Sequence, residues 1–385
     1  MWIERTSRAL LLDAVAARPA VVLTGARQTG KTSLLRRTFP AFHYVSLDLP
    51  GEAELAENDP LAFLTRHPPP LIVDEVQYAP GLFRHLKSAV DARRSLTGQF
   101  ILTGSQKFHL MHSVSDSLAG RVQILELEPL SLREIRDALG PMELDDLILR
   151  GGYPELYRDR ELDRTGFYHS YIATYLERDV RTLLNVSSLR DFERFLRACA
   201  LRSGQLLNKA ELARDVGINP MTANQWLSVM ETSGQAALVE PWFSNKTKSI
   251  VKSPKLYLTD TGLLTILLNI GNPDELRRSP MFGAIWETFV FAELRKREAA
   301  RQHRWSIHFF NDRRREVDFL IDRGGRFELY EAKSTEVVSP ADTASLDHVR
   351  EILGRRNVLQ RSIVCRSPGS YPLSNGAMVG TVHDL

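Results

Sequence analysis

The sequence predicts an α/β fold that is divided into several domains. Three observations predict it: apolar runs alternate with helical patterns in the first third, the pattern is helical alone from about Ser131, and strand-like runs return after Pro273. A chain of 385 residues is longer than one ordinary domain, so roughly two to four domains are expected.

The first third contains five short apolar runs that are expected to be strands. Most of them are nearly continuous rather than alternating, which is typical of strands buried on both faces of a parallel sheet. The segments between them, such as Thr32–Thr38 and Gly81–Ala92, have helical spacing. The expected strands are Ala20–Thr24, His43–Leu47, Leu71–Val73, Phe100–Leu102 and Val122–Leu127.

The first of these strands leads directly into a glycine-rich loop. Gly25–Thr32 fits the pattern G-x-x-x-x-G-K-[ST], in which the glycines let backbone N–H groups face a phosphate at the start of a helix. Lys31 is expected to neutralise β- and γ-phosphate oxygens, and Thr32 to offer a hydroxyl to Mg²⁺. The predicted nucleotide-binding residues are Gly25, Ala26, Arg27, Gln28, Thr29, Gly30, Lys31, Thr32 and Ser33.

Acidic and polar residues follow two of the other strands. The run Leu71–Val73 ends in Asp74 and Glu75, and we expect Asp74 to hold Mg²⁺ and Glu75 to orient and polarise the attacking water. Thr103 and Ser105 follow the next strand as candidate sensors of the γ-phosphate. Two motifs that occur in order, each after an apolar strand, predict an ATP-binding and ATP-hydrolysing site with Mg²⁺ as its metal.

Phosphoryl transfer also gains from an arginine at the γ-phosphate, often one supplied by a neighbouring subunit. Arg121 is the first candidate because it stands just before the fifth strand, and Arg178 is the second. The alternative for each is an ordinary surface arginine in an ion pair.

A small unit over about Gly204–Leu268 has the spacing of a winged helix-turn-helix, with Gly217 in the turn. Two helices and two wing strands are expected at Lys209–Asp215, Thr222–Thr232, Leu238–Phe243 and Lys255–Leu258. Pro241 would confine the first wing strand to an edge or a bulge. The candidate DNA contacts are Thr222, Asn224 and Gln225 on the second helix and Lys246, Lys248 and Lys252 in the wing, with Lys255 opening the second strand. The alternative is a module that only packs against the rest of the chain or a partner.

The last segment carries a predicted hairpin with charged residues on one face. The Gly324-Gly325 loop makes Arg323 pair with Arg326, so Asp318 lies opposite Glu331, and Lys333 shares the face of Glu331. Two carboxylates that close repel unless a cation lies between them. With Glu287 on the preceding helix, the set fits a metal-dependent nuclease of the D…E-x-K type. A solvent-facing charged stripe is the alternative; the basic run Arg313, Arg314 and Arg315 lies next to the set.

Bulk composition limits the remaining function classes. The net charge is +3, so a polyanionic partner must be read from local patches. Two cysteines exclude a disulfide framework, the charged N-terminus is unlike a signal peptide, and no apolar stretch is long enough for a membrane span. These features predict a cytoplasmic protein with no membrane partner.

Taken over nearly its full length, the chain resembles a widespread family of prokaryotic AAA-type P-loop ATPases, related to the archaeal-ATPase group, whose C-terminal domain is described as of unknown function. The matching stretches are Gly25–Thr32, Leu71–Gln77, Leu102–Ser105, Ser117–Arg121, Gly151–Glu155, Tyr171–Asp179, Ser253–Leu263 and the set Asp318, Glu331 and Lys333. The resemblance implies an AAA core over 1–130, a helical lid over 131–200, a winged helix over 201–270 and a PD-(D/E)xK-like, restriction-endonuclease-like domain over 275–385. It also implies Gly25–Ser33 and Asp74 as ligands of the nucleotide and Mg²⁺, and Glu75 as the catalytic acid.

These features predict a Mg²⁺-dependent ATPase that acts on DNA, branched or recombination intermediates included. It is expected to work as a homo-oligomer, with a hexamer as one candidate and Arg121 donated between subunits. Two alternatives stay open: an ATP-regulated nuclease and an ATP-dependent switch that binds a protein partner.

Overall fold

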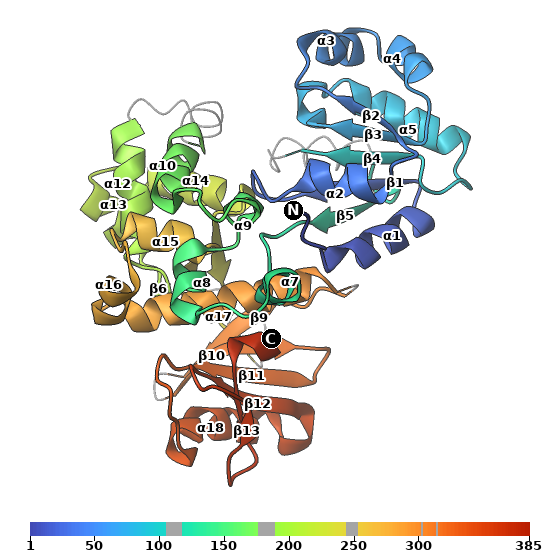
Figure 1. Cartoon of the computed structure of the whole chain (residues 1–385). Helices are drawn as coiled ribbons and strands as arrows, with labels where there is room; N and C mark the ends of the chain where they lie inside the picture. Colours follow the sequence, from blue (N-terminus) through green and yellow to red (C-terminus); the bar gives the residue numbers. More distant parts are fainter. Residues whose placement is uncertain (105–117, 176–188, 244–252, 302, 313–314) are drawn as a thin grey trace.

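The computed structural model describes residues 1–104, 118–175, 189–243, 253–301, 303–312 and 315–385. Its described strands form three sheets of five, three and six strands, which are joined by a helical region in the middle of the chain (Figure 1). No helix among these residues is long and apolar enough to cross a bilayer.

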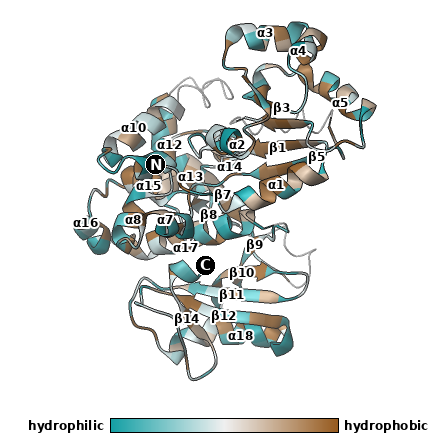
Figure 2. Cartoon of the chain, turned by 45° about the vertical axis from the view of Figure 1, so that its right-hand side comes forward, coloured by the Kyte–Doolittle hydropathy of each residue, from teal (hydrophilic) through white to brown (hydrophobic). Residues whose placement is uncertain are grey.

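The first sheet is parallel throughout and has the order β2-β3-β4-β1-β5. Every residue of β1, β3 and β4 is buried, as the continuous apolar runs predicted, and Figure 2 shows β1 and β3 in the brown of hydrophobic residues. The strands are β1 (Ala20–Thr24), β2 (His43–Ser46), β3 (Leu71–Asp74), β4 (Phe100–Thr103) and β5 (Val122–Glu126).

Helices cover both faces of this sheet because successive residues of a strand point to opposite sides. Val21 and Leu23 share a core with α1 (Ser7–Ala17) and α2 (Lys31–Thr38), whereas Val22 shares one with the helices of the other face. The helices of that other face are α3 (Pro50–Asn58), α4 (Pro60–Arg66) and α5 (Leu82–Ala92). In the order of the sheet, β4 lies between β1, which leads into the P-loop, and β3, which ends in Asp74.

Residues 131–200 are helical in the described part, as the sequence predicted. The first helix begins with a capping box, in which Ser131 and Glu134 exchange hydrogen bonds with each other's backbone N–H groups. The helices are α7 (Leu132–Leu139), α8 (Leu144–Arg150), α9 (Pro154–Arg158), α10 (Arg164–Tyr175) and α12 (Leu189–Ala200).

The next unit pairs a helix-turn-helix with a small antiparallel sheet of order β6-β8-β7. The turn between its helices uses Gly217, whose φ of 81° suits glycine. Its elements are β6 (Gln205–Leu206), α13 (Lys209–Val216), α14 (Pro220–Thr232), β7 (Ala236–Val239) and β8 (Lys255–Leu258), followed by α15 (Thr261–Leu267) and α16 (Pro273–Arg278). We call residues 201–270 the winged-helix-like unit.

The expected first wing strand, Leu238–Phe243, is wrong in its bounds. Strand β7 ends at Val239, and the chain then leaves β8 to pair with another sheet: Pro241 bridges Phe309, and the Trp242 N–H donates to the Phe309 carbonyl at 2.7 Å. Proline has no N–H to continue a ladder with β8, so the pairing changes at this residue.

The C-terminal part is a mixed sheet of order β13-β14-β12-β11-β10-β9 beside α17. The hairpin has the predicted register, because Arg323 pairs with Arg326 and Phe319 lies opposite Tyr330. The elements are α17 (Phe282–Ala299), β9 (Ile307–Asn311), β10 (Glu316–Asp322), β11 (Phe327–Ala332), α18 (Ala344–Leu353), β12 (Val358–Val364), β13 (Tyr371–Pro372) and β14 (Met378–Gly380).

One hydrophobic core runs through the helical region, the winged-helix-like unit, α17 and one face of the C-terminal sheet. The other face of that sheet packs on α18 in a core of its own. The predicted boundaries near residues 200 and 270 thus lie within one shared core, whereas the first sheet has separate cores on its two faces.

Candidate nucleotide site and a second acidic cluster

The P-loop connects β1 to α2 in a conformation that needs glycine at both ends. Gly25 has a φ of 144°, and a Cβ at this position would lie 2.3 Å from the Leu127 carbonyl oxygen. Gly30 has a φ of 91° and precedes the first turn of α2. The loop therefore follows the course that a phosphate-binding loop requires.

Lys31 lies at the first position of α2 and is 7% exposed. Its ammonium donates to the Gly25 carbonyl at 2.9 Å and to the Ala26 carbonyl at 2.8 Å. These contacts hold the positive charge inside the curve of the loop, where the sequence places a phosphate.

Thr32 and Asp74 meet at the edge of the sheet, as two ligands of one Mg²⁺ should. The Thr32 hydroxyl donates to Asp74 Oδ2 at 2.6 Å, and the Tyr44 hydroxyl donates to the same oxygen at 2.9 Å. This all-oxygen set fits Mg²⁺. Burial and the Asp74 carboxylate raise the pKa of Tyr44, because both disfavour a phenolate.

Glu75 follows Asp74 in a left-handed backbone conformation, with a φ of 54°. Its side chain accepts a hydrogen bond from the Gln77 amide, and its N–H donates to Asp74 Oδ1 at 3.1 Å. An uncommon backbone conformation at a carboxylate that lines the cavity is the kind of strain that functional sites retain.

Two adjacent cavities adjoin the P-loop and share Gln28, Gly30 and Ser33 in their walls. The first, of about 410 Å³, is also lined by Arg27, Lys31 and Thr32 of the loop, by Glu75, and by Tyr171 and Thr174 of α10. Its position beside Lys31 and Thr32 agrees with the position predicted for the phosphates.

The second cavity, of about 280 Å³, has the walls that a flat base prefers. Its lining includes Trp2, Ile3, Leu130, Pro154 and Arg158, none of which the sequence analysis selected as site residues. The N-terminal segment is held there by Arg5, whose guanidinium donates to the Thr29 carbonyl at 2.8 Å. The match of Gly151–Glu155 to the family pattern was the one signal in the sequence that pointed to this wall.

The sensor and arginine candidates have different outcomes. Thr103 is fully buried at the end of β4, and its hydroxyl has no hydrogen-bond partner within the described part of the chain. Arg121 pairs with Asp91 on α5 through two bonds, of 2.7 and 3.0 Å. Ser105 and Arg178 lie outside the described residues.

Arg121 comes just before the N-terminal end of β5, whereas the P-loop of its own chain follows the C-terminal end of the neighbouring strand β1. It precedes Val122, which pairs with Ala20, whereas the loop follows Thr24, which pairs with Glu126. The length of five strand residues, at about 3.3 Å each, separates these two ends of the sheet. Arg121 therefore does not reach the nucleotide of its own chain.

The winged-helix-like unit touches the P-loop through the turn between α14 and β7. A Cβ at Gly234 would lie 3.5 Å from the Ala26 Cβ, so this turn lies beside the loop. The adjacent Gln235 amide donates to the Tyr171 hydroxyl at 2.8 Å, and Tyr171 lines the phosphate cavity. The turn therefore lies next to the P-loop and is hydrogen-bonded to a residue of the phosphate cavity.

On α14, Asn224 and Gln225 are exposed and Thr222 is half-buried, so this face is open to solvent. Arg315 is also exposed. The wing lysines Lys246, Lys248 and Lys252, together with Arg313 and Arg314, lie outside the described residues.

The position of Lys255 contradicts its predicted role in the wing. It is 3% exposed, and its ammonium lies 2.9 Å from Glu287 Oε1, 2.5 Å from Glu316 Oε1 and 3.6 Å from Asp318 Oδ1. A lysine buried among carboxylates is not available to a phosphate backbone.

The four residues of the proposed nuclease set come together at the junction of α17 and the hairpin. Asp318 accepts from the Ala332 N–H at 2.8 Å, and Lys333 pairs with Glu331 at 2.7 Å. Burial and the neighbouring Asp318 carboxylate raise the pKa of both Glu287 and Glu331 to about 7. Even so, no three of the described His, Cys, Asp and Glu side chains are arranged to hold a metal ion.

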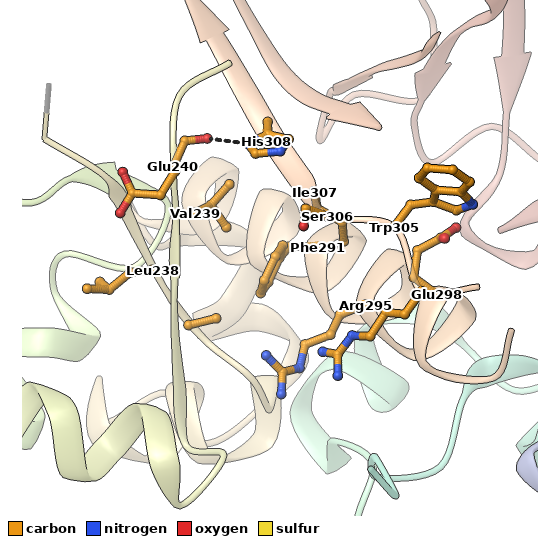
Figure 3. A pocket seen from close by; sticks show the side chains of 12 residues that line it. Leu238, Val239, Glu240, Phe291, Arg295, Glu298, Trp305, Ser306, Ile307 and His308 are labelled. Atoms are coloured by element: carbon orange, nitrogen blue, oxygen red, sulfur yellow. Dashed lines mark hydrogen bonds between the residues drawn. The ribbon is translucent and has the colours of Figure 1, made fainter. Parts of the chain in front are cut away.

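Helix α17 also joins the C-terminal domain to the first sheet. Arg295 reaches Glu126 and Glu128 at the end of β5, at 3.3 and 2.9 Å. Figure 3 shows the cavity beside it, of about 410 Å³, between β7, α17 and β9, where the Glu240 carbonyl contacts His308 at 3.2 Å.

Comparisons with known proteins agree with this geometry. Residues 17–136 match a family model described as an AAA domain, residues 282–385 match a domain of unknown function (DUF4143), and residues 142–274 match another (DUF8612). Uncharacterized protein Rv2008c of Mycobacterium tuberculosis is 33% identical over 379 residues, which cover 97% of this chain and 83% of that protein. Uncharacterized protein Mb2031c of Mycobacterium bovis gives the same values.

Among solved structures, the Walker-type ATPase PABY2304 of Pyrococcus abyssi matches 69% of this chain and 96% of its own. It has 17% identity and a TM-score of 0.48, which is too low to carry an argument on function. The full-length match to Rv2008c and the AAA domain over the first sheet lead to the same conclusion. The chain belongs to a family of AAA-type P-loop ATPases that carry an uncharacterised C-terminal domain.

Proposed function

We propose that the chain is a Mg²⁺-dependent ATPase that works as a homo-oligomer and remodels or moves along DNA. The observation that carries the ATPase part is the 2.6 Å contact between Thr32 and Asp74 at the edge of a cavity lined by the P-loop. It places a hydroxyl and a carboxylate together where the motif puts the metal.

Each residue has a task that its position supports. The P-loop N–H groups and Lys31 bind and orient the β- and γ-phosphates, and Mg²⁺, held by Thr32 and Asp74, supplies charge neutralisation when bound. Glu75, fixed by Gln77, orients a water and takes up its proton at a carboxylate oxygen. The apolar cavity beside Ile3 and Pro154 would receive the base and keep water away from it.

The position of Arg121 supports the proposal of a homo-oligomer. Arg121 is held by Asp91 at the far edge of its own sheet, so an arginine finger at this position serves the site of a neighbouring subunit. The Asp91 pair is 21–37% exposed and at the surface, where exchange for a phosphate partner costs little.

The contacts of Gly234 and Gln235 support transmission of the nucleotide state to the winged-helix-like unit. A loop that shifts when phosphates bind would move Ala26 and Tyr171, and both touch the turn between α14 and β7. The turn leads back along α14 to Asn224 and Gln225, the exposed residues that we propose face DNA.

Steady-state ATP hydrolysis with Mg²⁺, measured with and without duplex, single-stranded and four-way-junction DNA, tests the proposal. Lys31→Ala gives the blank, and Lys209→Ala, at an exposed position on α13, is the control that should keep the DNA-free rate. A several-fold stimulation by one DNA form is expected. Hydrolysis that no DNA changes would contradict the DNA part and favour the switch that binds a protein partner.

A further inference from the structure

The wing strand β8 sends two side chains into the C-terminal domain. Lys255 and Tyr257 are two residues apart, so both point to the same face of the strand. The Tyr257 hydroxyl donates to Glu287 Oε1 at 2.5 Å, the same oxygen that the Lys255 ammonium contacts at 2.9 Å. Two donors from one strand thus converge on one carboxylate of the nuclease-like set.

Lys255 reaches three elements of the C-terminal domain at once. Its ammonium contacts Glu287 on α17 and both Glu316 and Asp318 on β10, and it lies 5.6 Å from the ring centre of Phe309 on β9. A buried ammonium is stable only where opposite charges surround it. The carboxylates in turn need a cation between them, because neighbouring negative charges in a buried site repel one another.

We propose that the Lys255 ammonium is the resident cation of this acidic cluster and occupies the place that a divalent metal takes in a nuclease. The cluster then acts as an internal clamp that holds the wing on the C-terminal domain. With Lys255 in place the described acids are not arranged to hold a metal ion; we expect them to rearrange around a divalent cation when Lys255 is removed.

A second observation is a buried carboxylate oxygen in the cluster that lacks a hydrogen-bond partner. Glu331 is 8% exposed, and its Oε2 has no hydrogen-bond partner in the described residues, although its Oε1 pairs with Lys333. Four acids, Glu287, Glu316, Asp318 and Glu331, share two lysines, Lys255 and Lys333, so the lysines cannot pair with every acid that ionises. Removal of Lys255 leaves a site with carboxylate oxygens that a hard divalent ion prefers.

The clamp is reinforced beside the cluster. Trp242, just beyond β7, donates from its backbone to Phe309 on β9, and the indole N–H contacts Asp322 at 3.4 Å.

The test counts Mn²⁺ bound to the full-length, nucleotide-free protein by electron paramagnetic resonance. All samples carry Asp74→Ala, which removes the predicted ligand at the P-loop. Without further change we expect no Mn²⁺ that depends on Glu331; Lys255→Met should gain one Mn²⁺ per chain, and adding Glu331→Gln should lose it. An ion already bound with Lys255 present and lost with Glu331→Gln would overturn the proposal, as would no gain in Lys255→Met.

A stability measurement keeps the proposal testable if Lys255→Met folds poorly. Leaving buried carboxylates without their cation should lower the Tm by about 5 °C or more, and adding Glu287→Gln should recover part of that loss. Strictly additive effects would contradict the clamp. Lys296→Met, which removes a buried lysine that pairs with Glu293 at 2.7 Å outside the cluster, is the matched control and should gain no Mn²⁺.

Discussion

The P-loop site and the C-terminal cluster are built from the same residue types but differ in how their charges are met. At the P-loop, Lys31 rests on backbone carbonyls and Asp74 accepts from two hydroxyls, beside a cavity of about 410 Å³. In the C-terminal cluster, Lys255 lies among the carboxylates themselves. Acidic residues at the right spacing therefore define a site for an ion only where the fold leaves the ion's place open.

The two sites also differ in where their missing charge comes from. Lys255 completes the C-terminal cluster within one chain, whereas Arg121 cannot reach the P-loop of its own chain. The C-terminal cluster is thus completed by the folding of one chain, whereas we propose that the P-loop site is completed by a neighbouring subunit.

The largest expected effect is that of Arg121→Ala, which should lower kcat for ATP hydrolysis by about 10³-fold through loss of charge at the γ-phosphate. Nucleotide affinity should change little, because the proposed finger stabilises charge that develops only in the transition state. Fluorescent-nucleotide titration and steady-state kinetics measure the two quantities.

Mixing separates a finger supplied by a neighbour from a local structural role of Arg121. When the Arg121→Ala protein is mixed with the inactive Glu75→Gln protein, part of the lost rate should return. Oligomers that contain both variants have some sites with an intact Glu75 and a neighbour's intact Arg121. Mixtures that show only the sum of the two separate rates would contradict donation between subunits.

Glu75→Gln compares the two acidic sites directly. We expect a fall in ATP turnover of about 10²-fold, because an amide cannot take up the proton of the attacking water. Glu331→Gln, the matched change in the C-terminal cluster, should leave turnover within about twofold, since Glu331 does not line the cavity at the P-loop. Equal losses in both variants would show that the C-terminal cluster takes part in ATP hydrolysis.

Tyr171→Phe tests the connection between the phosphate cavity and the winged-helix-like unit. It removes the hydroxyl that accepts from Gln235 at 2.8 Å, a bond worth about 1 kcal/mol, or roughly fivefold. Stimulation of ATP hydrolysis by DNA should fall by about that factor, while turnover without DNA stays within about twofold. Stimulation equal to that of the wild type would show that the signal takes another path.

The last prediction concerns the exposed face of α14. Asn224→Ala and Gln225→Ala should each weaken DNA affinity, by about tenfold if the side chain contacts a base edge. Fluorescence anisotropy at two salt concentrations measures this change. Lys209→Ala on α13 is the control; a loss of affinity as large as that of Asn224→Ala would place DNA on a different face.

Local patterns were enough to predict the strands of the first sheet, because runs such as Ala20–Thr24 are buried on both faces and leave no polar alternation. The hairpin register followed from the Gly324-Gly325 loop alone. Helices α3 and α4 were not predicted; each has a single buried apolar residue, Ala56 and Phe63, so periodicity gives little signal.

Long-range contacts explain what the sequence analysis missed. Lys255 reads as one more basic residue of a wing, and its burial depends on acids 32 to 63 positions further along the chain. Likewise, β7 ends at Val239 because the next residues pair with Phe309 on another sheet. The walls of the apolar cavity beside the P-loop come from Ile3, Leu130 and Pro154, which are far apart in sequence and carry no shared motif.

The central claim is that the P-loop site accepts a divalent ion with its nucleotide, whereas the C-terminal cluster is filled by Lys255. The most direct test counts Mn²⁺ per wild-type chain with and without a non-hydrolysable ATP analogue. We predict one ion with the analogue and none without it, lost in Asp74→Ala and kept in Glu331→Gln. An ion that binds without nucleotide and disappears in Glu331→Gln would contradict the account.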